Sequence, residues 1–153
     1  MTSNINIKVV GVGGSGNNAV SRMMKYKIKG VELIAINADA QDLQKARAHR
    51  KLRIGRNLTK GLGAGMNPEV GRQAAEEQRE EIEQMLRDTD MLFIAGGLGG
   101  GTCSGASPVV AEIAKNLGAL TLAVVTMPFS FEGANRMEIA QNSLKRLKPR
   151  VDT

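Results

Sequence analysis

Two glycine-rich segments contain the residue types that could hold an anionic ligand. They are GVGGSGNN at Gly11–Asn18 and GGGTCSG at Gly99–Gly105, and each stands between an apolar run and a stretch with the apolar spacing of a helix. A strand-to-helix loop directs unpaired backbone N–H groups and the positive end of a helix dipole toward one point. Glycine lets an anion approach without obstruction by a Cβ atom. The pattern predicts binding of phosphate groups by the main chain.

The first segment also fits the dinucleotide fingerprint GxGxxG, at Gly11, Gly13 and Gly16. Asp39 follows at about the interval expected of an acidic residue that binds the ribose, although it would equally well cap a helix over Ala40–Ala48. An NAD-binding Rossmann domain of an oxidoreductase is therefore an alternative interpretation. The segment lacks the GK[ST] ending of a Walker P-loop, so no lysine is expected to reach the phosphates from it.

A third glycine-dense stretch, GLGAGMNPEVG, occupies Gly61–Gly71. Within it, Asn67 is predicted to be a helix N-cap and Pro68 the first helical residue. We expect one helix from Pro68 to about Asp88 with a charged, solvated face that includes a pair between Glu76 and Arg79.

The elements that must position these segments alternate between strand and helix. The order predicts an α/β fold with a parallel sheet, right-handed crossovers and helices on both faces. The loops that follow the strands, together with Asn37–Asp39, should then converge on one edge of the sheet. Two anion-binding loops suit a nucleoside triphosphate better than NAD. Strands are expected at Ile5–Val12, Gly30–Ile36, Lys51–Ile54, Met91–Ala95 and Ala119–Thr126, the last as an interior strand because it is apolar on both faces.

Composition limits the classes of protein to consider. A chain of 153 residues with 42% hydrophobic residues is expected to form a single domain, residues 1–153, with a substantial core. The net charge is +6, but the basic residues are scattered and only 3% of residues are aromatic, which argues against a nucleic-acid partner. The single cysteine excludes an internal disulfide, and the first residues lack the pattern of a signal peptide, so a cytoplasmic protein is expected. His49, the only histidine, is expected at the surface.

Four segments together resemble the FtsZ family of bacterial tubulin-like proteins, over the whole length of the chain. They are GVGGSGNNAVSRM at Gly11–Met23, GLGAG with NPEVG around Met66, GGGTCSG at Gly99–Gly105 and PFSFEGANR at Pro128–Arg136. The third is a variant of the tubulin signature GGGTG[ST]G. The resemblance implies a Rossmann-like GTP-binding domain with strand order 3-2-1-4-5 here, without the family's sixth strand. It also implies head-to-tail polymerisation into the division ring with GTP hydrolysis, and contact with the membrane only through partner proteins.

The resemblance further implies which residues contact GTP or GDP. Gly13 would allow the first turn, Ala64 and Gly65 would lie near the γ-phosphate with Mg²⁺ bound through the phosphates, and Glu132 and Arg136 would lie on the ribose side. From spacing alone, Glu132 and Arg136 would be an ion pair on a helix surface. The other implied nucleotide contacts are Gly14, Ser15, Gly16, Asn17, Asn18, Asp39, Gly100, Gly101, Thr102, Cys103, Ser104 and Gly105.

The sequence departs from the family pattern at three positions. The family usually has Gly in place of Cys103, Thr in place of Ala38, and Gly or Ala in place of Met66. A positive φ at Cys103 would cost on the order of 1 kcal/mol. Its position at a helix N-terminus predicts a reactive thiol that nucleotide would shield, and a small buried packing residue is the alternative.

Other parts of the family's architecture have no counterpart in this sequence: a sixth strand, a core helix, and a second domain whose acidic residues act on the neighbour's GTP. We therefore expect this chain to bind GTP or GDP with little or no hydrolysis. The expected partners are guanine nucleotide, another copy or full-length FtsZ in head-to-tail contact, and a complementary C-terminal half. The unpaired strand at the edge predicts a tendency to associate.

Overall fold

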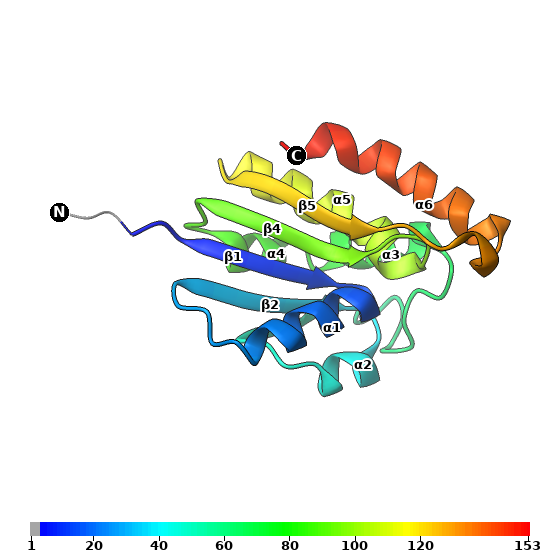
Figure 1. Cartoon of the computed structure of the whole chain (residues 1–153). Coiled ribbons are helices and arrows are strands. Elements are labelled where there is room, and N and C mark those ends of the chain that lie inside the picture. Colours follow the sequence, from blue (N-terminus) through cyan, green and yellow to red (C-terminus); the bar gives the residue numbers. More distant parts are fainter. Residues whose placement is uncertain (1–3) are drawn as a thin grey trace.

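A five-stranded parallel sheet forms the centre of the computed structural model, which describes residues 4–153 (Figure 1). The spatial order is β3-β2-β1-β4-β5, which confirms the predicted α/β fold and its strand order. Met1–Ser3, part of the segment on which the expectation about a signal peptide depends, lie outside the described residues. The strands are β1 (Ile7–Val12), β2 (Val31–Asn37), β3 (Arg50–Arg53), β4 (Met91–Gly97) and β5 (Leu120–Thr126).

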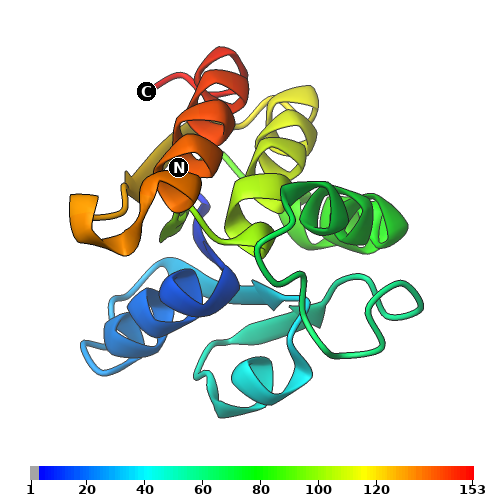
Figure 2. The ribbon, with the colours of Figure 1, turned by 90° about the vertical axis from the view of Figure 1, so that its right-hand side faces the viewer.

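Helices cover both faces of the sheet, as predicted (Figures 1 and 2). On one face lie α1 (Gly13–Met24) and α2 (Ala40–Lys45). The other face is covered by α3 (Pro68–Glu77), α4 (Arg79–Leu86), α5 (Gly101–Asn116) and α6 (Ala134–Leu147). Two short 3₁₀ turns, η1 (Ser130–Glu132) and η2 (Lys148–Arg150), flank α6. No helix within residues 4–153 is long and apolar enough to cross a bilayer.

The central strands are buried on both faces, which is why their sequences are nearly continuous apolar runs. In β1, Val10 and Val12 belong to the large core shared with α3, α4 and α5, whereas Val9 belongs to a smaller cluster with Val20 of α1 and Leu33 of β2. The alternation along β1 therefore anchors both helical layers to the same strand.

Both glycine-rich segments lie largely inside helices. The loops expected at Gly11–Asn18 and Gly99–Gly105 are shorter, because α1 already begins at Gly13, α5 begins at Gly101, and β4 continues to Gly97. Gly13, with φ +76°, makes the turn from β1 into α1 in a single residue, a conformation that side chains disfavour. The first helical turns therefore stand directly at the edge of the sheet.

The single helix predicted for Pro68–Asp88 is wrong. Gln78 interrupts it with φ −104° and ψ 24°, so that α3 ends at Glu77 and α4 starts at Arg79. The buried Gln78 side chain accepts a hydrogen bond from Gly55 N (2.6 Å), and the Glu77 carboxylate accepts from backbone N–H groups of the loop that follows Gly55. These tertiary hydrogen bonds stabilise the break between α3 and α4, although no glycine or proline marks it in the sequence. The predicted pair between Arg79 and Glu76 is present at 3.0 Å.

Strand β5 lies at the edge of the sheet, so the prediction of an interior strand is also wrong. On its uncovered face Leu120 is 46% exposed and Val124 is 63% exposed. The edge itself is partly paired, because Asp152 N donates to Thr121 O (2.8 Å) and Ala123 N donates to Thr153 O (2.9 Å). A strand with two apolar faces favours burial of both faces, but its sequence does not show whether another element covers them.

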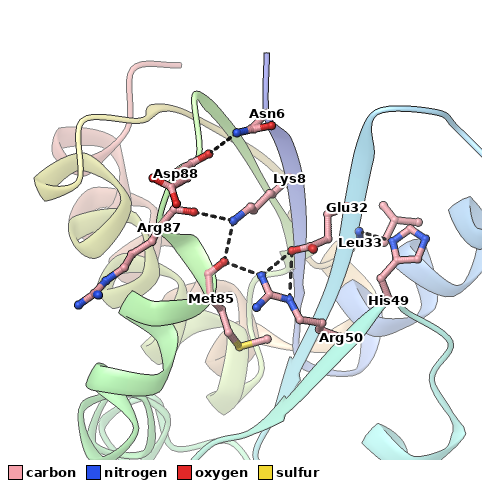
Figure 3. Close-up of polar contacts among 9 residues, drawn as sticks. All are labelled: Asn6, Lys8, Glu32, Leu33, His49, Arg50, Met85, Arg87 and Asp88. Carbon is pink, nitrogen blue, oxygen red and sulfur yellow. Dashed lines mark hydrogen bonds and ion pairs between the residues drawn. The ribbon is translucent and has the colours of Figure 1, made fainter. Parts of the chain in front are cut away.

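At the amino ends of the strands, side chains satisfy backbone groups (Figure 3). Lys8 Nζ donates to Met85 O (2.9 Å) and Arg87 O (2.8 Å), and Arg50 also donates to Met85 O while bonding Glu32. Burial lowers the pKa of Lys8. The two cations thereby provide partners for the carbonyl end of α4, where the helix dipole is negative. His49 is exposed, as expected, and its Nδ1 accepts a hydrogen bond from Leu33 N (2.8 Å).

Candidate functional site

A cavity of about 890 Å³ lies at the carboxyl ends of the strands. It is bounded by the last residues of β1, β2, β4 and β5, by the first turns of α1 and α5, and by the Leu62–Gly65 loop. The convergence expected of loops that follow parallel strands is therefore present. In Figure 1 this edge is the one at which α1 begins, opposite the end of the sheet at which β1 begins.

The first turns of α1 and α5 have no side-chain cap. Their N-cap residues, Val12 and Gly100, provide no capping side-chain bond, and neither helix has an acidic residue in its first turn. The first N–H groups of a helix have no partner within the helix, and together with the dipole they favour an anion. Two such helix starts facing one cavity can hold a ligand with more than one phosphate group.

Glycine allows the walls of the cavity to approach one another closely. A Cβ at Gly13 would lie 3.4 Å from Cys103 N, so the starts of α1 and α5 are adjacent. A Cβ at Gly101 would lie 2.6 Å from Gly65 O, the same carbonyl that accepts a hydrogen bond from Gly101 N (2.8 Å). The Leu62–Gly65 loop is thereby held against α5.

The charged side chains around the cavity are mostly acidic. The carboxylates of Asp39, Asp42 and Glu132 line it, Arg136 is the cation among the lining residues, and no lysine is included. An anion would therefore depend on backbone N–H groups rather than on basic side chains. Glu132 Oε2 accepts from Phe129 N (2.6 Å), and the predicted ion pair of Glu132 with Arg136 is not among those within residues 4–153.

Most of the residues predicted to contact a nucleotide lie around this cavity, and they come from segments far apart in the sequence. They are Gly13, Gly14, Ser15, Asp39, Ala64, Gly65, Gly100, Gly101, Thr102, Cys103, Glu132 and Arg136. The cap alternative for Asp39 is confirmed, because its Oδ1 accepts from Asp42 N (3.0 Å) at the start of α2, and the residue also lines the cavity.

Two of the glycines predicted to contact a nucleotide lie where a helix packs against another element. A Cβ at Gly16 would lie 2.5 Å from Ala95 O, so Gly16 lets α1 approach β4. A Cβ at Gly105 would lie 1.9 Å from Pro68 O, so Gly105 lets α5 approach α3. Both glycines position the helices whose first turns face the cavity.

Three predicted polar residues also lie away from the cavity. The buried Asn17 amide donates to Gly11 O (3.0 Å) and Ile36 O (3.1 Å), and Ser104 Oγ accepts from Gly99 N (2.9 Å). Asn18 lines a separate cleft between α1 and α2. The bonds of Asn17 and Ser104 fix the turns that precede α1 and α5.

The prediction missed several residues that line the cavity. Asn37 is expected at the edge where the loops converge but not as a nucleotide contact, and its Nδ2 donates to Asn17 Oδ1 (3.0 Å) while its Oδ1 accepts from Asp39 N (3.1 Å). The sequence offers a signal for only part of the missed set, namely for residues that end a strand or directly adjoin a predicted contact. Besides Asn37, the missed residues are Val12, Asp42, Leu62, Gly63, Gly97, Leu98, Thr126, Met127, Pro128 and Phe129.

The prediction of a reactive thiol at Cys103 is wrong. The side chain is 4% exposed, and burial raises the pKa of its thiol to about 12. A Cβ at Gly96 would lie within 2.3 Å of the Cys103 Sγ, so the sulfur packs against β4. Desolvation outweighs the effect of the helix N-terminus, and the alternative of a small packing residue is the correct one. The backbone at Cys103 is helical, so the anticipated strain is absent.

A metal ion in the cavity would need ligands besides the side chains of the protein. Within residues 4–153, no three His, Cys, Asp or Glu side chains are grouped so that they could bind a metal by themselves. Mg²⁺ commonly uses one or two carboxylates together with substrate phosphates and water. Asp39 and Asp42 are the neighbouring carboxylates that could contribute.

Sequence comparison finds a family model and relatives that match nearly the whole chain. Residues 6–153 match the family model described as "Tubulin/FtsZ family, GTPase domain". The "Cell division protein FtsZ 1" of Thermococcus kodakarensis is 57% identical over 147 residues, covering 96% of this chain and 39% of that protein. "Cell division protein FtsZ" of Buchnera aphidicola is 56% identical over all 153 residues, which are 40% of its length. The chain thus spans about two fifths of the relatives it matches.

Two solved structures also superpose on nearly the whole chain. The structure titled "FtsZ dimer, empty (M. jannaschii)" superposes with a TM-score of 0.96 and 52% identity, covering 98% of this chain and 44% of that one. "CetZ2 from Haloferax volcanii - GTPgS bound protofilament" superposes with a TM-score of 0.89 at 26% identity, covering 97% of this chain and 48% of that one.

Proposed function

Because the chain belongs to the Tubulin/FtsZ family, we propose that it forms a GTP-binding domain whose cavity holds the phosphates of GTP or GDP. The observation that carries the proposal is the pair of uncapped helix starts, α1 and α5, on one cavity whose lining contains no lysine. Neither the family match nor the relatives support the NAD-binding alternative.

The proposed contacts follow from the positions of the elements. The N–H groups of Gly13–Ser15, Gly100 and Thr102 would face the phosphates, whereas Gly101 N is used by Gly65 O, and Ala64 and Gly65 would lie beside the terminal phosphate. Arg136 and Glu132 lie on the β5 side of the cavity, where the ribose is assigned. Mg²⁺ would neutralise phosphate charge next to Asp39 and Asp42.

We expect residues 4–153 alone to hydrolyse GTP slowly. Hydrolysis needs a group that orients water, and the resemblance to FtsZ assigns that role to acidic residues of a second domain on the neighbouring subunit. Relatives are titled as a dimer and as a protofilament. By analogy, we propose head-to-tail association of this domain with FtsZ subunits in the cytoplasm, in a polymer that acts in cell division.

Calorimetric titration with GTP, GDP, ATP and NAD tests the proposal. GTP and GDP should bind with Mg²⁺ present, and each should raise the melting temperature by an amount that grows with the logarithm of its concentration above Kd. ATP and NAD should bind at least roughly tenfold more weakly, a difference of about 1.4 kcal/mol. Binding of NAD in preference to GTP would refute the assignment.

A further inference from the structure

A second cleft, of about 400 Å³, lies between α1 and α2. It meets the main cavity at Gly14 and Asp42, which line both, and continues toward the carboxyl ends of the two helices. Arg22 stands in the last turn of α1 and Lys45 in the last turn of α2. The cleft is thus an extension of the cavity along the outer helical layer.

The walls of this cleft contain four cations and one carboxylate. Asp42 stands at the end shared with the main cavity, and the cations are exposed. None of them takes part in an ion pair within the described part of the chain. The cations are Arg22, Lys25, Lys45 and Arg47. Their mutual repulsion is relieved only by solvent and counter-ions.

Helix termini alone do not account for the cluster. A cation in the last turn of a helix stabilises the dipole, which is sufficient reason for Arg22 and Lys45. Arg47 lies beyond the end of α2, and its N–H donates to Ser21 Oγ (2.8 Å) on α1. This bond ties the two walls together and holds a cation from one element beside those of the other.

The lining indicates the chemistry of a ligand. Ala46 is the one apolar residue among those that line the cleft, so there is no surface for a peptide side chain or an acyl chain to bury. We propose that the α1–α2 cleft binds the phosphate groups of a compact polyanion, for which inorganic tripolyphosphate is the probe. The amide group of Asn18 also lies beside the cations, whereas Ser21 Oγ is used in hydrogen bonds to Asn17 O (2.7 Å) and from Arg47 N (2.8 Å).

Occupancy of the cleft should weaken nucleotide binding, and nucleotide should weaken the polyanion equally. Both ligands would be negative on either side of Gly14 and Asp42, and a coupling between two sites is reciprocal. This coupling rests on the proposed nucleotide function, whereas binding to the cleft does not.

The test is calorimetric titration of tripolyphosphate into protein saturated with GDP, so that the main cavity is filled. The double variant Arg22→Glu/Lys45→Glu should lose roughly tenfold or more in affinity. The matched control, Lys145→Glu/Arg146→Glu, reverses the same number of charges in the last turn of α6 and should bind as the unchanged protein does. Equal affinities in the two variants, or no binding at all, would overturn the proposal.

Two further measurements separate the possible outcomes. If GDP itself does not bind, the titration is repeated with Gly100→Asp, which places a carboxylate in the main cavity, so that failure of the nucleotide site and failure of the cleft are distinguished.

Tyr26 and Ile28 are 78% and 43% exposed beside Lys25, which makes a lipid surface the other source of phosphate. Sedimentation with vesicles of anionic phospholipid, against neutral vesicles, tests it. Vesicle binding without tripolyphosphate binding would overturn the assignment to a free polyanion.

Discussion

Four of the helices that begin at the carboxyl edge of the sheet, α1, α2, α3 and α5, fall into two pairs. Helices α2 and α3 are capped by Asp39 and Asn67, whose side chains accept from Asp42 N and Glu69 N at 3.0 Å, and each has an acidic residue in its first turn. Helices α1 and α5 have neither feature. A cap serves the helix itself, and its omission at two adjacent helix starts keeps N–H groups available to an external anion.

The difference shows how one sheet edge can serve stability and binding at once. The starts of α1 and α5 give up a stabilisation of about 1 kcal/mol each, the usual contribution of a capping side chain. The cap positions are Val12 in α1 and Gly100 in α5, neither of which supplies an accepting side chain, and the two starts are adjacent because a Cβ at Gly13 would lie 3.4 Å from Cys103 N. Variants of these positions and of the capped ones can separate the two roles.

The largest expected effect concerns Cys103, in the first turn of α5. With the thiol pKa raised to about 12 by burial, maleimide labelling at pH 8 should be slower than that of an exposed cysteine on the order of a thousandfold. The measurement is the labelling rate in buffer and in denaturant, with and without GDP. Rapid labelling of the folded protein would mean that the helix N-terminus controls this thiol.

Gly100→Asp would convert the uncapped start of α5 into a capped one. Gly100 is the N-cap residue, has φ −88°, and a Cβ there would meet no atom within 4 Å. The variant should gain about 1 kcal/mol in the free energy of unfolding and lose roughly a hundredfold in GTP affinity, because its carboxylate competes with phosphate.

The control for that variant is Gly100→Asn, which caps without a charge. It should give a similar stabilisation, measured by urea denaturation, with a smaller loss of affinity. If Gly100→Asp bound GTP as tightly as the unchanged protein, the start of α5 would not be a phosphate site.

Asn67→Ala removes a cap from the opposite pair. We expect α3 to lose about 1 kcal/mol of stability, since an orphan N–H of Glu69 loses its partner, while GTP affinity changes by less than about threefold. Urea denaturation and calorimetry measure the two quantities. Asn142→Ala, at an exposed position of α6, is the control. A large loss of affinity would show that α3 also takes part in binding.

The smallest expected effect is the pH dependence due to Glu69, in the first turn of α3. Its hydrogen bond from Arg72 lowers the pKa of the carboxyl below its ordinary 4.5. The stabilisation is therefore present above about pH 4.5 and lost as the pH falls through the lowered pKa. Urea midpoints between pH 6 and pH 3 should fall slightly more for the unchanged protein than for Glu69→Gln. Parallel curves would contradict this assignment.

The sequence pattern was sufficient for the parallel α/β class and for the meeting of the glycine-rich segments, because both depend on local patterns and on the chirality of crossovers, whereas the strand order came from the resemblance to the FtsZ family. It was insufficient where a residue type serves two purposes. Asn17 has the chemistry of a ligand contact, yet its amide is used by Gly11 O and Ile36 O. The break at Gln78 depends on a bond to Gly55 N, which no local pattern records. The burial of Cys103 likewise depends on the distance between α5 and β4.

The amide chain that runs from Gly11 O through Asn17 and Asn37 to Asp39 N joins the start of α1 to the backbone that precedes α2. Each amide in it uses both its oxygen and its nitrogen, so no member can rotate without breaking two bonds. A ligand that shifts the start of α1 must therefore also shift the backbone that precedes α2. The two sides of the cavity would therefore move together when a ligand binds. A displacement at the start of either helix would be transmitted to the other through these hydrogen bonds.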